Sequence, residues 1–143
     1  MRPCIVVIDD DVDTVDCLRM ALEWQSFLVV GAFSGKVGLE LVRQHDPSLV
    51  LVDVMMPNLN GLEVCRCLRA DPATCAIPIV VLSARSSLAD QTAAFEAGAD
   101  HYLTKPVTLE KLTRLVNDIL ERPALAGISG AQEVKDENLN RRR

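Results

Sequence analysis

Apolar and polar positions form blocks along the chain that predict a repeated unit of strand and helix. Continuous apolar runs bounded by turn residues are typical of strands that are covered on both faces, as in a parallel sheet. The runs that fit this pattern are residues 5–8, 27–33, 49–52, 77–82 and 102–103. The second contains Gly31 and the last is brief, so these two are the less regular members.

Segments with helical spacing separate these runs. Apolar side chains recur every three or four positions near residues 15–22, 37–42, 62–68, 88–95 and 109–120. Ser34 precedes the second segment, Ser87 and Asp90 have capping-box spacing at the fourth, and Thr108 can cap the fifth. Strict alternation of strands and helices predicts right-handed crossovers and a doubly wound α/β sandwich.

Composition and charge limit the class of protein. A chain of 143 residues with 49% hydrophobic content fits one domain with a single core. The net charge of -5 disfavours a protein that coats nucleic acid or an anionic membrane. No segment has the length of a membrane span, and the apolar run that follows Pro3 is too short for a secretory signal. We therefore expect a cytoplasmic protein.

Two further features concern organisation. From Pro123 onward the periodicity lapses, so we expect one domain over residues 1–122 and a tail or linker over residues 123–143. The 5 cysteines are odd in number and scattered through apolar segments, which favours reduced thiols over a disulfide framework or a zinc site.

Polar side chains stand where four of the predicted strands end. They are Asp9, Asp10 and Asp11 after the first strand, Asp53 at the end of the third, Ser83 after the fourth and Lys105 after the fifth. Open α/β sheets bind their ligands outside the carboxyl ends of the strands. We therefore expect these acid, hydroxyl and amine groups to gather around one site.

The acids in this set predict a metal site. Two unit charges about 4 Å apart repel by roughly 4 kcal/mol at an effective dielectric near 20, so a cluster of Asp9 or Asp10 with Asp53 requires a cation. Mg²⁺ takes one or two carboxylates together with water and phosphate oxygen. The alternative is that acids after strands are helix N-terminal charges or turn formers, which suits Asp11 and Asp13.

Four motifs carry a resemblance to a known family. They are "VVIDDD" at residues 6–11, "LVLVDVMMPNLNGLEV" at 49–64, "IPIVVLSA" at 77–84 and "GADHYLTKP" at 98–106. In this order, each at a strand end, they resemble the receiver domains of response regulators in two-component signalling, over about residues 3–121. The resemblance implies a flavodoxin-like (βα)5 three-layer sandwich like that of a chemotaxis receiver, with parallel strand order 2-1-3-4-5.

The resemblance also implies roles for the strand-end residues. Asp53 corresponds to the phosphoacceptor, Asp10 to the direct ligand of Mg²⁺, and Asp9 to the acid that binds the metal through water. Met55 would contribute its backbone carbonyl to the metal. Lys105 would pair with Asp53 before phosphoryl transfer and with the phosphoryl group after it.

Two further residues match the conformational switch of the family. Ser83 would donate its hydroxyl to a phosphoryl oxygen and draw the following loop inward, and Tyr102 would follow that loop by changing its rotamer. The alternatives are an ordinary hydroxyl beside a helix for Ser83 and an amphipathic edge residue for Tyr102. The Lys105-Pro106 bond is similar to a cis junction of the family.

The function implied is that of a phosphorylation-controlled switch. Asp53 would receive a phosphoryl group from a histidine kinase or histidine phosphotransfer protein, and the conformational change would control an output domain or partner, without turnover of an external substrate. A homodimer through the fourth helix, fifth strand and fifth helix is the family's frequent arrangement. We expect no membrane contact and no direct binding of nucleic acid by this domain.

Two alternatives stay open. The first is a Mg²⁺-dependent phosphohydrolase with an aspartyl phosphate, a class that usually has a second acid two residues after the nucleophile, where this chain has Met55. The second is a receiver-like interaction domain without phosphorylation. Its usual signature is loss of the metal acids or of the lysine, and all of them are present here.

Overall fold

A computed structural model, which describes residues 2–121, shows five strands alternating with five helices in this part of the chain. All strand pairs are parallel, and the order in the sheet is β2-β1-β3-β4-β5, so the predicted flavodoxin-like α/β class is confirmed. In chain order the elements are β1 (Cys4–Ile8), α1 (Val12–Trp24), β2 (Leu28–Ala32), α2 (Gly35–His45), β3 (Leu49–Asp53), α3 (Gly61–Ala70), β4 (Ile79–Ser83), α4 (Leu88–Ala97), β5 (His101–Thr104) and α5 (Leu109–Ile119).

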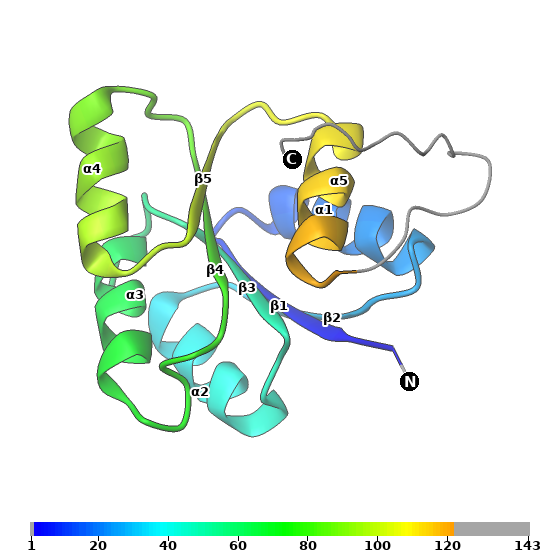
Figure 1. The fold of residues 1–143 in the computed structure, drawn as a ribbon, viewed down its shortest axis with the longest axis horizontal. Coiled ribbons are helices and arrows are strands. Elements are labelled where there is room, and N and C mark those ends of the chain that lie inside the picture. Colours follow the sequence, from blue (N-terminus) through cyan, green and yellow to red (C-terminus); the bar gives the residue numbers. More distant parts are fainter. Residues whose placement is uncertain (1, 122–143) are drawn as a thin grey trace. The chain divides into compact units, whose positions relative to one another are not determined.

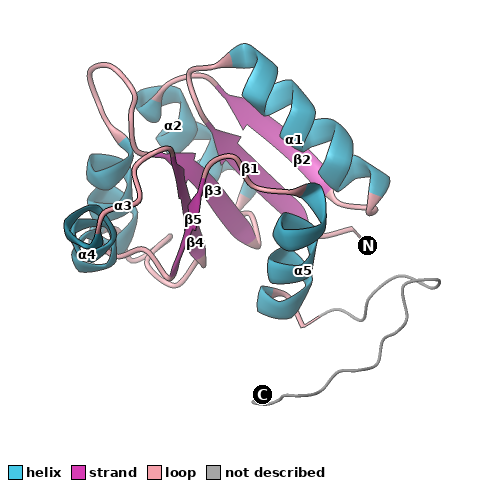
Figure 2. Cartoon of the chain, turned by 90° about the horizontal axis from the view of Figure 1, so that it is seen from above, coloured by secondary structure: helices cyan, strands magenta, loops and turns pink. Residues whose placement is uncertain are grey.

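The chain divides into two compact units, Met1–Val107 and Thr108–Arg143. The first unit holds the whole sheet and α1 to α4. Within it, α1 covers one face of the sheet, while α2, α3 and α4 lie side by side on the other (Figure 1; Figure 2). The described part of the second unit is α5, which Thr108 caps and which buries Leu112 and Val116. The expected tail over residues 123–143 lies outside the described residues.

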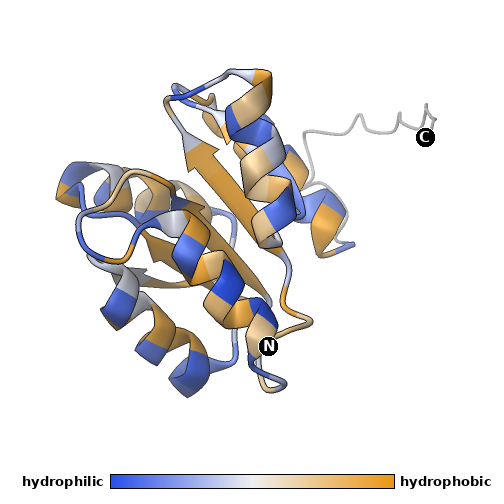
Figure 3. Cartoon of the chain, turned by 90° about the vertical axis from the view of Figure 1, so that its left-hand side faces the viewer, coloured by the Kyte–Doolittle hydropathy of each residue, from blue (hydrophilic) through white to orange (hydrophobic). Residues whose placement is uncertain are grey.

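The strands are apolar along their length because both faces of the sheet are covered (Figure 3). Side chains alternate between the faces of a strand. Val6 and Ile8 of β1 therefore pack into the cluster that contains Leu39 of α2, while Ile5 and Val7 point to the opposite face and are equally buried. This burial on both sides explains why β1, β3 and β4 show runs without alternation.

Strand boundaries differ from the sequence prediction where turns intervene. Strand β4 begins at Ile79 rather than at Ile77, because the N–H of Ile77 donates to Thr74 in a turn. Phe27 lies outside β2 because its N–H donates to Leu22 at the end of α1. Strand β5 extends over His101–Thr104, two residues longer than the apolar pair at 102–103 suggested.

Side-chain caps begin most of the helices, as the sequence predicted. Ser34, Ser87 and Thr108 each accept a hydrogen bond from a backbone N–H in the first turn of α2, α4 and α5. Helix α3 begins with a capping box between Asn60 and Glu63, whose spacing the sequence contains but which was not predicted. Each cap satisfies backbone groups that the helix itself leaves unpaired.

Two composition-based expectations can be compared with the structure. None of the helices in residues 2–121 is long and apolar enough to cross a membrane. All 5 cysteines are unpaired, and they range from the buried Cys65 to the exposed Cys17 and Cys75. Burial raises the pKa of the Cys65 thiol to about 11, so this side chain acts as a small apolar core residue at neutral pH.

Arg69 joins α3 to the C-terminal end of α4. Its Nε donates to the carbonyl of Gly98 at 2.9 Å, and its Nη1 donates to the carbonyls of Cys75 and Ile77. Its Nη2 pairs with Asp100 at 2.7 Å, and the same Asp100 oxygen accepts the N–H of Ile79. Gly98 has a φ of +117°, and a Cβ there would lie 2.5 Å from the Arg69 side chain. One guanidinium thus fixes three segments of the backbone.

We expect Arg69→Ala to lower the free energy of unfolding by about 2 to 4 kcal/mol, because it leaves two part-buried carbonyls and Asp100 without their donor. Urea denaturation followed by circular dichroism measures this change. Arg43→Ala is the matched control: Arg43 pairs with Asp71 but its side chain is 52% exposed, so its loss should cost no more than about 1 kcal/mol. Equal losses in the two variants would contradict the role given to Arg69.

Candidate active site

The register of the sheet brings Asp9 and Asp53 together. Ile8 of β1 pairs with Val52 of β3, so Asp9 and Asp53 are the next positions on two neighbouring strands. Ile5 and Leu49 are paired, and Asp9 and Asp53 each lie four residues further along. Because side chains alternate between the two faces of a strand, Asp9 and Asp53 point to the same face as that pair. The two carboxylates therefore leave the sheet on the same side, at its carboxyl edge.

Three acids form a cluster at this edge. Oxygen atoms of Asp9, Asp10 and Asp53 lie within 4.8 Å of one another. Asp9 is 3% exposed and Asp53 is 7% exposed, whereas Asp10 is an exposed residue. The inner two acids are thus shielded from water, and the third opens the cluster to solvent.

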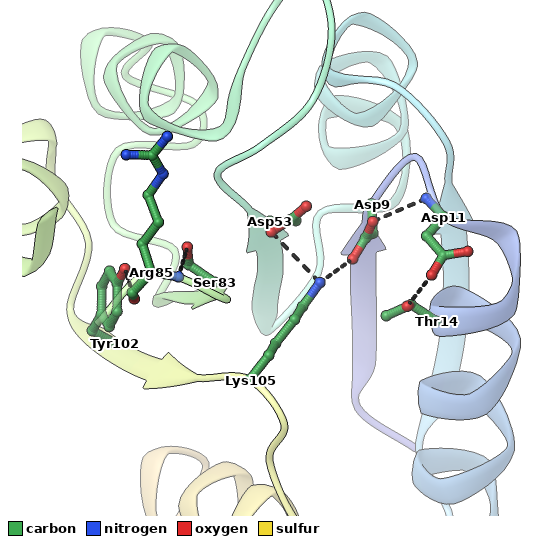
Figure 4. A network of polar contacts seen from close by, with 8 residues as sticks. All are labelled: Asp9, Asp11, Thr14, Asp53, Ser83, Arg85, Tyr102 and Lys105. Carbon is green, nitrogen blue, oxygen red and sulfur yellow. Dashed lines mark hydrogen bonds and ion pairs between the residues drawn. The ribbon is translucent and has the colours of Figure 1, made fainter. Parts of the chain in front are cut away.

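Lys105 supplies the positive charge that balances the inner acids. Its Nζ lies 2.9 Å from Oδ2 of Asp9 and 3.5 Å from Oδ1 of Asp53, so the ammonium stands between the two carboxylates (Figure 4). Lys105 follows β5, whose last residue Thr104 pairs with Ser83 of β4. The Lys105-Pro106 peptide bond is cis, as the resemblance implied.

The cluster shifts the pKa of its own members. Burial raises the pKa of the Asp53 carboxyl, and the charge of Asp9 raises it further; Lys105 and a hydrogen bond from the Met55 backbone act in the opposite direction without cancelling the rise. For Lys105, burial acts to lower the pKa, but the hydrogen bond to Asp9 and the charges of Asp53 and Asp9 outweigh it and hold the pKa above its usual value. The lysine is therefore charged at neutral pH.

The loop after β3 turns back tightly over Asp53. The N–H of Gly61, the first residue of α3, donates to the carbonyl of Val54 at 3.0 Å. A Cβ at position 61 would collide with the backbone carbonyl of Asp53 and lie 2.8 Å from the Cα of Val54. Gly61 therefore allows α3 to begin directly against the end of β3. Met55, between them, has a side chain that faces solvent and is 51% exposed.

Ser83 and Tyr102 hold the loop after β4, and among the described residues neither hydroxyl is hydrogen-bonded to the acids (Figure 4). The Ser83 hydroxyl, fully buried at the end of β4, accepts the N–H of Arg85 at 3.1 Å. The Tyr102 hydroxyl donates to the carbonyl of Arg85 at 2.7 Å. Both backbone polar groups of Arg85, its N–H and its carbonyl, are thus held by hydrogen bonds.

The donor set fits a hard divalent cation. Carboxylate oxygens are the ligands that such cations prefer, and here three of them converge while one remains open to solvent. Asp11 and Asp13 have the other role foreseen for them: Asp11 is the N-cap of α1 and Asp13 lies in its first turn. The pocket of Asp9, Asp10 and Asp53 could therefore bind a metal.

Sequence reasoning missed some of the contacts that shape the site. The closer partner of Lys105 is Asp9, at 2.9 Å, and this pairing follows from the position of β5, which no local pattern contains. Gly61 was noticed only as part of a motif, although an Asn-Gly pair before a helical segment signals a tight helix start. The capping box between Asn60 and Glu63 could have been found from its spacing alone.

We expect Asp53→Asn to raise the free energy of unfolding at pH 7 when divalent cations are removed with EDTA. The folded-state pKa of Asp53 lies above its unfolded value, so the folded protein binds this proton more tightly and loses stability as pH rises through that folded pKa. The amide removes this loss, and the difference between variant and wild type should shrink as pH falls below about 4. Urea denaturation at both pH values measures it.

Asp13→Asn is the control for that experiment. Asp13 is an exposed acid in the first turn of α1, so its neutralisation should change the stability by less than about 1 kcal/mol. A wild-type protein that is more stable than Asp53→Asn at pH 7 without divalent cations would show that Lys105 fully offsets the burial of Asp53.

Comparison with known proteins identifies the family. Residues 5–117 match the family described as response regulator receiver domain. A protein named response regulator MprA from Mycolicibacterium vanbaalenii is 40% identical over 139 residues, which cover 95% of this chain and 59% of that protein. The relative of the same name from Mycobacterium leprae is 42% identical over 118 residues, 82% of this chain and 51% of its own length. The chain thus spans little more than half the length of these relatives.

Solved structures agree with this assignment. A putative response regulator from Chloroflexus aurantiacus superposes with a TM-score of 0.79 at 33% identity, covering 85% of this chain and 100% of that one. The chemotaxis protein CheY4 of Vibrio cholerae shares the fold, with a TM-score of 0.80 at 21% identity over 83% of this chain and 99% of its own. The matched family, together with the acids and the lysine at the strand ends, leads to one conclusion: the chain belongs to the response regulator receiver domain family.

Proposed function

We propose that this receiver domain accepts a phosphoryl group on Asp53 with the help of Mg²⁺ and changes conformation in response. The observation that carries the proposal is the arrangement of Asp53 at the end of β3, with two further acids within 4.8 Å and an ammonium at 3.5 Å. A carboxylate in this setting can act as a nucleophile only when positive charge is supplied nearby. The site offers two sources of it, a lysine and a metal pocket.

The chemical step is a transfer between a phosphohistidine and Asp53. A carboxylate oxygen of Asp53 forms a bond to phosphorus while the bond between phosphorus and the imidazole nitrogen breaks. The electron pair of that bond stays on the nitrogen, which takes up a proton from solvent, and an acyl phosphate remains on Asp53. Lys105 would follow the charge from the carboxylate to the phosphoryl oxygens.

Asp10, Asp53 and the backbone carbonyl of Met55 would hold the cation, with Asp9 behind them. When bound, Mg²⁺ neutralises the charge that accumulates as the phosphoryl oxygens approach the carboxylates. The exposed position of Asp10 suits a cation that keeps several waters. Gly61 keeps the loop close to Asp53, which would allow the Met55 carbonyl to reach the pocket.

The response would pass through the loop after β4. Ser83 would turn its hydroxyl proton toward a phosphoryl oxygen and draw Arg85 with it, since the two are hydrogen-bonded. Tyr102 contacts the same residue, so a shift of the loop changes the environment of its ring. The switch is therefore a shift in population between two arrangements of this loop and α4.

The partner we infer is a histidine kinase or a histidine phosphotransfer protein. We place this domain in the cytoplasm and expect it to contact neither a membrane nor nucleic acid. We place the receiver within residues 1–122 and a tail or linker at 123–143. The matched residues cover only 59% and 51% of these two relatives, and we infer that an output domain or a separate target receives the signal. A homodimer through α4, β5 and α5 stays a prediction; α4 does expose Leu88 and Phe95.

We expect one phosphoryl group per chain after incubation with acetyl phosphate and Mg²⁺, measured by intact mass. The addition should be absent in Asp53→Ala, which lacks the acceptor. In Asp10→Ala its rate should fall at least about tenfold, because the site then holds Mg²⁺ less well and the anionic donor meets the uncompensated charge of Asp9 and Asp53. EDTA should have the same effect on the wild-type protein.

Asp13→Ala is the control, because Asp13 is another acid near the end of β1. This variant should accept the phosphoryl group at the wild-type rate. Rapid multiple turnover of phosphate esters would instead identify a phosphohydrolase. No modification of the wild-type chain would identify an interaction domain that is not phosphorylated. Modification that persists in Asp53→Ala would show that another residue is the phosphoacceptor.

We expect Tyr102→Phe to accept phosphoryl normally but to loosen the loop after β4. The variant loses one hydrogen bond, from the hydroxyl to the Arg85 carbonyl, worth about 1 kcal/mol, so amide hydrogen exchange over residues 84–88 should be about fivefold faster. Exchange in β1, measured in the same sample, is the internal control. Unchanged exchange over residues 84–88 would show that Tyr102 does not restrain the loop.

A further inference from the structure

The outer edge of β2 lacks the features that usually protect the margin of a sheet. Among the described residues, β2 lies at one margin and has β1 as its single neighbour in the sheet (Figure 2). Its sequence is LVVGA, with no charged residue and no proline. Natural sheets usually protect such an edge with charges or proline, because its unpaired backbone groups can join another strand. The opposite margin, β5, is shorter and is followed by Lys105 and Pro106.

The hydrogen bonds to β1 indicate which backbone groups of β2 lie at this edge. The N–H of Leu28 donates to the residue before β1, and the carbonyl of Ala32 accepts from the residue after β1. Successive residues of a strand direct their N–H and C=O groups to alternate sides. The N–H and C=O groups of Val29 and Gly31 therefore point away from β1, toward the open edge.

Arg19 of α1 lies beside this edge without a partner. A Cβ at Gly31 would lie 2.5 Å from Nη2 of Arg19, so the guanidinium lies directly over Gly31. Its Nε is shielded from water and has no hydrogen-bond partner within residues 2–121. Asp16 and Glu23 lie three and four positions away on the same helix, yet among the described residues neither forms an ion pair with Arg19. A buried donor without an acceptor is costly, so a carboxylate that reaches this edge would be favoured.

The other face of the same edge is apolar. Leu28 is 47% exposed and lies on the same face of β2 as Val30, which packs against the core cluster beneath α2. On α2, Arg43 pairs with the residue that follows α3, so this side of the helix faces α3. Val37 and Leu41 lie on the side of α2 away from Arg43, and Val37 is 43% exposed. The edge thus has apolar side chains on one face and a guanidinium on the other.

We propose that β2 pairs antiparallel with β2 of a second copy of this chain, so that the two five-stranded sheets form one continuous sheet. With Val30 opposite Val30 of the second copy, Val29 of each copy lies opposite Gly31 of the other. These are the residues whose N–H and C=O groups are free, and each such pair exchanges two hydrogen bonds. The register also covers the exposed Leu28. This interface lies at the margin opposite β5 and does not depend on the proposed phosphoryl transfer.

The same register brings opposite charges together on the α1 face. Helix α1 and β2 are consecutive and run in opposite directions, and Arg19 lies over Gly31. A step from Gly31 back to Val29 is about 6.6 Å, which corresponds to about four residues of a helix, so Glu23 lies near the level of Val29. Because Gly31 faces Val29 of the second copy, Arg19 of each copy meets Glu23 of the other. The surface is thus complementary to itself, as a two-fold interface requires.

The test is sedimentation velocity of the full chain between about 1 µM and 1 mM, without phosphodonor or Mg²⁺. We expect a reversible dimer that Arg19→Glu weakens at least about tenfold, because two attractive contacts become repulsive. Glu23→Arg should weaken it to a similar extent. An equimolar mixture of the two variants should dimerise within about threefold of wild type, because each contact again joins opposite charges.

Asp13→Arg is the matched control, because it reverses an exposed acid on the same helix, ten positions before Glu23. This variant should dimerise like wild type. Leu88→Glu tests the other face considered for a dimer, since Leu88 is 79% exposed on α4. It should also leave this dimer unchanged.

Amide hydrogen exchange of the wild-type chain locates the interface without any substitution. Exchange over residues 28–32 should become at least about threefold slower between dilute and concentrated protein, because the edge amides gain partners. Residues 101–104 of β5 are the internal control and should not change. Protection of β5 or α4 in place of β2 would overturn the proposal.

A wild-type chain that stays monomeric up to about 1 mM would overturn the proposal. A dimer that Arg19→Glu leaves intact, or that the mixture of folded variants fails to restore, would overturn it as well. Circular dichroism checks the fold of each variant. If Arg19→Glu does not fold, Arg19→Gln takes its place and should weaken the dimer at least about threefold, since both charge pairs are lost without new repulsion.

Discussion

Two carboxylates at adjacent strand ends, Asp9 and Asp53, share one ammonium in a place that water hardly reaches. The parallel register of β1 and β3 forces the acids together, and only the cation from the end of β5 makes that proximity tolerable. The rest of the molecule serves this arrangement. Strands buried on both faces fix the spacing of the acids, and the tight start of α3 at Gly61 keeps the loop after β3 close to them.

The pattern of apolar runs predicted most of the strands and helices of the fold. Continuous apolar runs predicted β1, β3 and β4, because those strands are covered on both faces. Helix caps such as Ser34 and Thr108 lie at the positions that the sequence predicted. The strand order came only from the resemblance, since local periodicity does not say which strands are neighbours. Boundaries failed where a backbone turn outweighed side-chain character, as at Ile77.

The site was foreseen in composition but not in its pairing. Polar residues at strand ends are visible in a sequence, and a parallel sheet collects them at one edge. Which acid the lysine prefers depends on ångström differences set by β5 and the following turn, and here it is Asp9. The hub at Arg69 escaped notice for a similar reason: its acceptors are mostly backbone carbonyls, which every residue carries and no residue type announces.

The contacts of Arg69 give the two ends of α4 different freedom. Gly98 and Asp100 tie the C-terminal end to α3 and β4, whereas the N-terminal end is held by Ser87, Asp90 and the loop that carries Arg85. A helix of 10 residues is about 15 Å long. A displacement of about 1 Å at its N-terminal end would then be a tilt of roughly 4° about its C-terminal end. In such a tilt about Gly98 the displacement would be greatest at Leu88, where the exposed apolar surface of the helix begins.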